Sequence, residues 1–155
     1  MKGRLRQDVL VRPFAPEDAG RVIAVWHASK QDVYTFIALE QSYTIETDSA
    51  FFRRYIEPRC DLFVAELDGA IVGYLAMNES YIDRLYVMPE QQRQGVGTRL
   101  IERAREHSPA GLELHTHQKN ERARNFYEKH AFVAVHFGIS PPPESEPDVE
   151  YHWRA

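Results

Sequence analysis

Polar and apolar positions along the chain follow two periods, which predict strands and helices in a mixed order. Runs that are apolar throughout or at every second position predict strands at 8–14, 61–67, 70–77, 81–87, 112–117, 132–138 and 149–154. Apolar residues at helical spacing predict helices that begin near Pro16, Asp48, Gly95 and Asn120. The predicted order is a strand, two helices, three strands, a helix, a strand, a helix and two strands.

Short local signals set several element boundaries. Asp68-Gly69 lies between two apolar runs and is the strongest short signal for a β-hairpin. Asp48 is a plausible N-cap for a second helix over 49–57, and this helix must end before Pro58. The buried face of the first helix is predicted to carry Val22, Val25, Trp26 and Ser29.

Composition predicts one domain, 1–155, with no role at a membrane or on a nucleic acid. The 155 residues are 43% apolar, which is enough for a substantial core. A net charge of −4 and a pI of about 6.0 argue against a nucleic-acid binder. No apolar run approaches the roughly 20 residues of a membrane span, and MKGRLRQD at the N-terminus lacks the apolar segment of a secretion signal. The single cysteine, Cys60, cannot form an internal disulfide, so we expect a cytoplasmic location.

A strand, a glycine turn and a helix follow one another in the middle of the chain. The apolar run YIDRLYV (81–87) ends near Pro89, the turn QQRQGVG (91–97) follows, and TRLIERAREH (98–107) has helical periodicity. Glycines let the backbone approach an anion closely, and the first N–H groups of a helix point at it. The segment therefore predicts a phosphate-binding site. It has neither the glycine spacing of a dinucleotide fingerprint nor the Lys-Ser/Thr pair of a P-loop.

A second motif follows in LELHTHQKN (112–120) and ERARNFYEKHAF (121–132). The two segments give V-x-P-x-x-Q-x-x-G-x-G and then N-x-x-A-x-x-x-Y-E-K-x-x-F, an ordered pair that resembles the GNAT superfamily of N-acetyltransferases. The general layout is similar from Val9 to Trp153. The resemblance implies an α/β fold with a mixed, twisted, mostly antiparallel sheet of about seven strands, and helices on both faces. The chain departs from the family at Ala131, where a glycine is frequent; if φ is positive there, alanine costs roughly 1 kcal/mol.

The resemblance also implies acetyl-coenzyme A (acetyl-CoA) as co-substrate and assigns its contacts. Main-chain N–H groups are expected to bind the pyrophosphate at Gln92, Arg93, Gln94, Gly95, Val96, Gly97 and Thr98. The main chain of Leu85 and Val87 is expected to pair with the pantetheine arm like an added strand, and one N–H would hold the thioester oxygen as an oxyanion hole does. Asn120 either caps its helix, binds the pantetheine arm, or does both.

Acetyl transfer to an amine needs an acid for the leaving thiolate and a base for the attacking amine. Tyr127 occupies the general-acid position of the family. A tyrosine pKa near 10 lies above a thiol pKa near 8.5, so we expect this phenol first to hydrogen-bond the developing thiolate. His115, five residues before Asn120, is one candidate base, and Asp83 on the preceding strand is the other. His115 and His117 share a strand face but lack the third ligand of a metal site, so no metal is expected.

An aromatic segment, 26–46, corresponds by resemblance to the variable region that covers the acceptor groove of the family. Candidate acceptor-binding residues in this segment and on the histidine strand are Trp26, Tyr34, Phe36, Glu40 and His117. The carboxylate in this group would attract a cationic amine. Packing of the aromatic residues as ordinary core is the alternative.

These features predict an acetyl-CoA-dependent N-acetyltransferase that acts on a primary amine of a small molecule, or less favourably of a peptide, by direct attack in a ternary complex. A non-catalytic acyl-CoA sensor on the same fold is the first alternative, and the presence of Tyr127 disfavours it. An unrelated nucleotide-phosphate binder is the second, although no base pocket or Mg²⁺ ligands are recognisable. Because many relatives pair, a homodimer is a candidate assembly.

Overall fold

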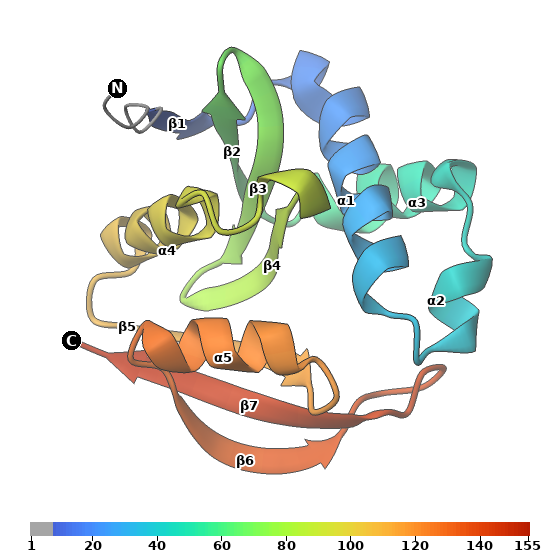
Figure 1. Cartoon of the computed structure of the whole chain (residues 1–155), viewed down its shortest axis with the longest axis vertical. Coiled ribbons are helices and arrows are strands. Elements are labelled where there is room, and N and C mark those ends of the chain that lie inside the picture. Colours follow the sequence, from blue (N-terminus) through green and yellow to red (C-terminus); the bar gives the residue numbers. More distant parts are fainter. Residues whose placement is uncertain (1–7) are drawn as a thin grey trace, which may run out of the picture.

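Seven strands form one sheet in the order β1-β2-β3-β4-β5-β7-β6 (Figure 1). The computed structural model describes residues 8–155. The strands are β1 (Val9–Pro13), β2 (Asp61–Leu67), β3 (Ala70–Asn78), β4 (Tyr81–Val87), β5 (Gly111–His117), β6 (Val133–Ile139) and β7 (Pro147–Arg154). The helices are α1 (Ala19–Val33), α2 (Ala38–Ser42), α3 (Ile45–Phe51), α4 (Val96–His107) and α5 (Glu121–Lys129). Short 3-10 turns lie at Pro16–Asp18 and Pro89–Gln91, and a π-helical turn lies at Phe52–Ile56. The predicted mixed, mostly antiparallel sheet is confirmed.

The sheet opens between β4 and β5. These two strands are parallel neighbours, and among the described residues only Tyr81 and Glu113 are paired between them. By contrast, β5 and β7 are antiparallel and stay paired from Gly111 to His117. Beyond the single pair, β4 and β5 diverge, and α5 lies in front of β5 (Figure 1). The facing edges of the two strands are thus left without a neighbouring strand.

Helices cover both faces of the sheet, as predicted. On one face, α1 and the π-helical turn contribute a core that includes Val22, Val25, Trp26, Phe52 and Ile56. On the other face, α4 and α5 contribute a second core that includes Val96, Leu100, Ile101, Ala104 and Tyr127. The predicted buried stripe of α1 is confirmed, including Ser29, which is 1% exposed.

The predicted N-cap at Asp48 is wrong. The second helical segment begins earlier, at Ile45, and Thr44 caps it with a side-chain oxygen that accepts a backbone hydrogen bond. Asp48 is buried inside α3, where its carboxylate lies 2.7 Å from Lys30 Nζ and 2.8 Å from His27 Nδ1. An aspartate before an apolar run looks the same in sequence whether it caps a helix or pairs with a distant lysine, so local pattern does not separate the two.

The Asp-Gly hairpin between β2 and β3 is confirmed. Asp68 has a φ of 55° and Gly69 a φ of 79°, so both central residues are left-handed. This is the geometry of a type I′ turn, whose twist matches that of the flanking strands. The turn sets Leu67 opposite Ala70 at the start of the ladder.

Ala131 has a φ of 70°, in the left-handed region that strains a residue with a Cβ atom. We expect Ala131→Gly to raise the free energy of unfolding by about 1 kcal/mol and the Tm by about 2–4 °C, because glycine removes that strain. Thermal unfolding followed by circular dichroism measures the change. Ala50→Gly, at an exposed helical position of α3, is the matched control and is expected to lose about 1 kcal/mol. A Tm for Ala131→Gly at or below that of the wild type would contradict this account.

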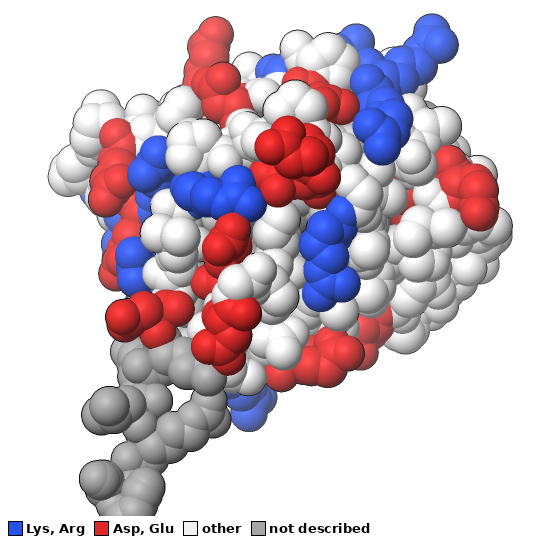
Figure 2. Space-filling model, turned by 90° about the horizontal axis from the view of Figure 1, so that it is seen from above, with Lys and Arg blue, Asp and Glu red and all other residues white. Residues whose placement is uncertain are grey.

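Basic and acidic side chains are intermixed on the face seen from above (Figure 2). Within residues 8–155, no helix is long and apolar enough to cross a membrane. The segment from which the lack of a secretion signal was predicted falls mostly in residues 1–7, which lie outside the described residues.

Candidate active site

A cleft of about 880 Å³ lies where β4 and β5 diverge. Its walls come from α1, β4, the turn before α4, β5 and α5. Residues predicted to take part in function that line it are Tyr34, Asp83, Leu85, Val87, Gln92, Arg93, Gly95, Gly97, Thr98, His115, Asn120 and Tyr127. The fold thereby brings both sequence motifs to one cleft.

The turn before α4 presents backbone N–H groups to this cleft. Gly95 precedes the helix with a φ of 88°, a conformation that favours glycine. The N–H of Arg99 donates to the Gly95 carbonyl at 3.1 Å, so the N–H groups of the preceding helical residues have no acceptor inside the helix. Gly97 also permits close packing, since a Cβ there would lie 3.0 Å from the Phe126 ring. An anion in the cleft would meet free N–H groups and the positive end of the helix dipole.

Two side chains of the same loop do not line the cleft. The Gln94 amide donates to the Glu90 carbonyl at 3.3 Å, and the Val96 side chain is 1% exposed in the core. The prediction for these two residues concerned their main-chain N–H groups. Only their backbone, and not their side chains, is available to bind the pyrophosphate. Arg93 does line the cleft, with a φ of 69° that strains a residue carrying a Cβ.

The edge of β4 that faces the cleft carries the main-chain groups of Leu85 and Val87, which were predicted to contact the coenzyme. The Met88 N–H bonds to Val72 in β3 at 2.8 Å, and alternate residues of a strand bond to opposite sides. Leu85 and Val87 therefore direct their main-chain groups away from β3. Consistent with this, the Val87 carbonyl accepts from Ser29 Oγ at 3.0 Å and also from the side-chain amide of Gln92.

Tyr127 presents its phenol to the cleft from the second core, beneath α4 and α5. Its side chain is buried, and burial raises the pKa of Tyr127 well above its usual value near 10. Among residues 8–155 no side chain or carbonyl hydrogen-bonds to this hydroxyl, so it is free to donate to a ligand. Asn120 caps α5, as one interpretation predicted: its Oδ1 accepts from the Ala123 N–H at 3.1 Å.

Both candidate bases line the cleft, and one of them is held by neighbours. His115 Nδ1 is 3.0 Å from the Tyr81 hydroxyl, and its Nε2 is 3.8 Å from Glu150 Oε1. Asp83 lies beside Arg84, with 3.5 Å between the carboxylate and the guanidinium. Within residues 8–155, no group of three His, Cys, Asp or Glu is arranged to hold a metal ion.

The model of the Acetyltransferase (GNAT) family matches residues 23–132. The chain belongs to this family. A relative, peptidyl-lysine N-acetyltransferase YjaB of Salmonella typhimurium, is 28% identical over 123 residues, which cover 79% of this chain and 81% of the relative. This GNAT protein is an N-acetyltransferase enzyme.

Solved structures share the fold of this GNAT chain. The solution structure of apo-form YjaB from Escherichia coli has a TM-score of 0.79 and 22% identity, and the match covers 94% of this chain and 97% of that one. A putative streptothricin acetyltransferase from Bacillus anthracis str. Ames, in complex with acetyl coenzyme A, has a TM-score of 0.69 and 18% identity, covering 96% and 100% of the two chains. At these identities the likeness describes the fold.

The predicted acceptor residues of this GNAT enzyme separate into two places. Tyr34 lines the cleft, where its hydroxyl is 3.1 Å from that of Tyr86. Trp26, in contrast, is 4% exposed in the core, so it does not line the groove as predicted. Phe36 packs on the His117 ring, with 5.8 Å between the ring centroids, and both lie outside the residues that line the cleft.

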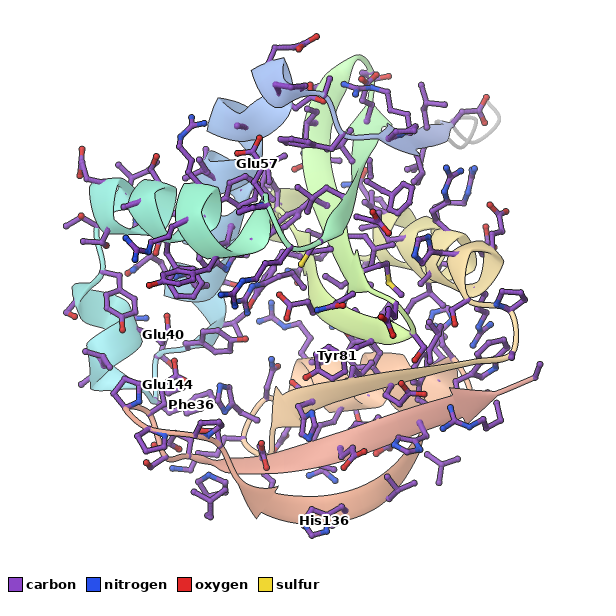
Figure 3. All side chains as sticks on the ribbon, turned by 180° about the vertical axis from the view of Figure 1, so that it is seen from behind. Phe36, Glu40, Glu57, Tyr81, His136 and Glu144 are labelled. Atoms are coloured by element: carbon purple, nitrogen blue, oxygen red, sulfur yellow. The ribbon has the colours of Figure 1, made fainter. Side chains whose placement is uncertain are left out.

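Glu40 is buried beside a second carboxyl group. Its Oε1 lies 3.4 Å from Lys30 Nζ, so this acid already faces a cation of the protein itself. Glu144, in the loop before β7, lies close to it (Figure 3). A hydrogen bond with Glu40, together with burial, raises the pKa of Glu144 to about 7. The Glu144 carboxyl group is therefore a much weaker acid than an exposed glutamate.

Several residues of this GNAT site were not predicted from sequence. Arg122 lines the cleft, and its NH1 is 2.8 Å from Gln92 Oε1 and 3.1 Å from Asp32 Oδ2. Arg122 is the second residue of α5, two positions after the helix cap at Asn120. Tyr81 and His115, which contact each other, lie on two strands and are 34 residues apart in sequence. No local sequence pattern predicts this contact.

Proposed function

We propose that this enzyme transfers the acetyl group of acetyl-CoA to a primary amine by direct attack in a ternary complex. The observation that carries the proposal is the convergence on one cleft of free N–H groups at the start of α4, the unpaired edge of β4 and the Tyr127 hydroxyl. The diphosphate, the amide-bearing arm and the thioester of acetyl-CoA require these three kinds of partner in this order. The complex of acetyl coenzyme A with the Bacillus anthracis relative supports the choice of co-substrate.

The residues of the chain have separate tasks in binding this co-substrate. The N–H groups of Val96, Gly97 and Thr98 bind the diphosphate, and Arg93 adds a charge-assisted contact. The β4 edge at Leu85 and Val87 pairs with amide groups of the pantetheine arm, as an added strand would. The side-chain NH₂ of Asn120 remains available to the same arm, because the helix cap uses only its oxygen.

The acid and the base come from different elements, α5 and β5. Tyr127 keeps its proton because burial raises its pKa, and it donates a hydrogen bond to the sulfur as negative charge develops there. His115 accepts the proton that the attacking amine must lose. Asp83 is the rival base, and its carboxylate lies 3.5 Å from the Arg84 guanidinium.

A small-molecule amine and a lysine side chain of a peptide are the two acceptor classes. The YjaB relative is named a peptidyl-lysine N-acetyltransferase, which favours the second class. Residues of the aromatic segment, above all Tyr34, contact the acceptor in either case. A cytoplasmic location and a homodimer remain expectations that accompany this function.

A thiol-release assay with acetyl-CoA tests the proposal against polyamines, amino acids, aminoglycosides and lysine-containing peptides. We expect release of coenzyme A that depends on a primary amine, with a lysine peptide among the acceptors. Binding of acetyl-CoA by calorimetry without thiol release for any of these amines would instead support the sensor. Competition of ATP or GTP with coenzyme A for the cleft would support the nucleotide binder.

A further inference from the structure

Glu150 on β7 lies at the centre of a group of histidines on the sheet face away from α5. Alternate residues of the strand, Val149 and Tyr151, are buried in the core, so Glu150 points to the opposite face. Antiparallel pairing sets it directly across from His115 on β5 and from His136 on β6. Its Oε1 is 3.8 Å from His115 Nε2, so one carboxylate lies beside the candidate base.

A hydrogen-bonded series on the same face orients this carboxylate. The His152 Nε2 is 2.6 Å from Glu150 Oε2, and its Nδ1 is 3.3 Å from the Arg154 guanidinium. A guanidinium has only donors, so Nδ1 of His152 accepts and its Nε2–H donates to Glu150. Arg154 is held in turn by Glu113 at 2.9 Å. One oxygen of Glu150 is thereby occupied, and the other is turned toward His115.

We propose that Glu150 is a positioning residue that holds His115 in the tautomer with its proton on Nε2. The negative charge of an ionised carboxylate favours a proton on the ring nitrogen that faces it, here across 3.8 Å. The hydrogen bond from His152 and the nearby histidines lower the pKa of Glu150, which keeps this carboxylate ionised. The lone pair of His115 then lies on Nδ1, which faces the Tyr81 hydroxyl at 3.0 Å. The proposal rests on the proposed role of His115 as base.

This tautomer gives the proton a defined route. Burial raises the pKa of Tyr81 to about 12, so Tyr81 is protonated and donates to Nδ1 of His115. Tyr81 does not itself line the cleft, so the proton of the acceptor amine reaches the Tyr81 oxygen by way of solvent, and the original hydroxyl proton passes to Nδ1. One N–H and one O–H bond break, one O–H and one N–H bond form, and the imidazolium faces Glu150. The His115 side chain is 43% exposed, which lets the proton leave to solvent.

Several titratable or charged groups lie around His115, at different distances from its ring nitrogens. They are Tyr81, Asp83 and Arg84 on β4, Glu113 and His117 on β5, Asp148, Glu150, His152 and Arg154 on β7, and His136 on β6. Within the described part of the chain, Glu150 is the carboxylate that lies within 4 Å of its ring nitrogens. Asp148 sits on the same strand and face as Glu150 and is paired with His117 instead. These two acids therefore make a matched pair for an experiment.

Glu150→Gln tests the proposal, with Asp148→Asn as the control. Nitrogen-15 NMR of the imidazole rings is expected to show the Nε2–H tautomer of His115 in the wild type and in Asp148→Asn, but a mixture of tautomers in Glu150→Gln. In the same variant kcat/KM should fall about 10-fold, because part of the population presents the wrong nitrogen.

Two results would overturn the role of Glu150: a wild-type His115 with its proton on Nδ1, or an unchanged tautomer in Glu150→Gln. The NMR readout needs no acceptor, so it stands apart from the proposed function. Full thiol release by His115→Ala would remove the base assignment while leaving the tautomer measurement valid. Loss of activity in His115→Ala with a changed tautomer in Glu150→Gln supports both.

Discussion

Tyr127→Phe is expected to lower kcat about 100-fold and to leave the KM for acetyl-CoA nearly unchanged. The phenol donates to sulfur only as charge develops there, so its loss affects the transition state and not the bound ground state. The ring itself stays, and with it the packing on Phe132 at 5.4 Å between ring centroids. Steady-state kinetics by thiol release measure both constants. Because burial raises the pKa of Tyr127, its deprotonation should add no basic limb to the wild-type profile below about pH 10.

Tyr151→Phe is the matched control for this result. Tyr151 is fully buried in the same core, 6.3 Å from Tyr127 between ring centroids, and its hydroxyl donates to Glu128 away from the cleft. The kcat of Tyr151→Phe should stay within about twofold of the wild type, because no reacting atom lies near the Tyr151 hydroxyl. A kcat for Tyr127→Phe as high as that of the control would remove Tyr127 from the chemistry.

Lys30→Met is expected to lower the free energy of unfolding by about 3–5 kcal/mol. The ammonium group lies between two buried carboxylates, 2.7 Å from Asp48 and 3.4 Å from Glu40, and over the Trp26 ring at 3.9 Å. Removing the cation leaves buried negative charge without its main partner, which costs far more than the lost attraction of an exposed pair. With about 2–4 °C of Tm for each kcal/mol, the Tm should fall by roughly 10 °C. Chemical denaturation and thermal scans measure both quantities.

An exposed ion pair and a double variant complete this experiment. Arg99 and Glu102 on α4 are 3.2 Å apart and about half exposed, so Arg99→Met should change stability by less than about 1 kcal/mol. The double variant Lys30→Met/Asp48→Leu should recover part of the loss, because it removes a carboxylate together with the cation. Equal losses in Lys30→Met and Arg99→Met would contradict a buried network beneath α1.

Parts of the molecule that depend on neighbouring residues were predictable from sequence. The Asp68-Gly69 turn, the glycine start of α4 and the cap at Asn120 each follow from bonds within a few residues. The same holds for Ala131, whose positive φ follows from a local turn after α5. Each of these features has a residue preference that the backbone geometry imposes directly, so the pattern carries the information.

Parts that depend on distant pairing were not predictable. Asp48 was misassigned because its partner, Lys30, lies on another helix. Trp26 and Tyr34 look alike in an aromatic segment, yet only the packing of α1 against the sheet separates a buried ring from one at the cleft. The partners of His115 come from two other strands, so the sequence named the histidine but not what holds it.

The single residue pair between β4 and β5 also has a mechanical meaning. A sheet resists spreading through the ladder of bonds between adjacent strands, and here that ladder is one register position, Tyr81 opposite Glu113. The two halves of the sheet, β1 to β4 and β5 to β7, are therefore joined by strand pairing at one end only. A small change in the angle between the two halves breaks almost no backbone hydrogen bonds between strands. The distance between β4 and β5 can therefore change at little cost in backbone hydrogen bonding.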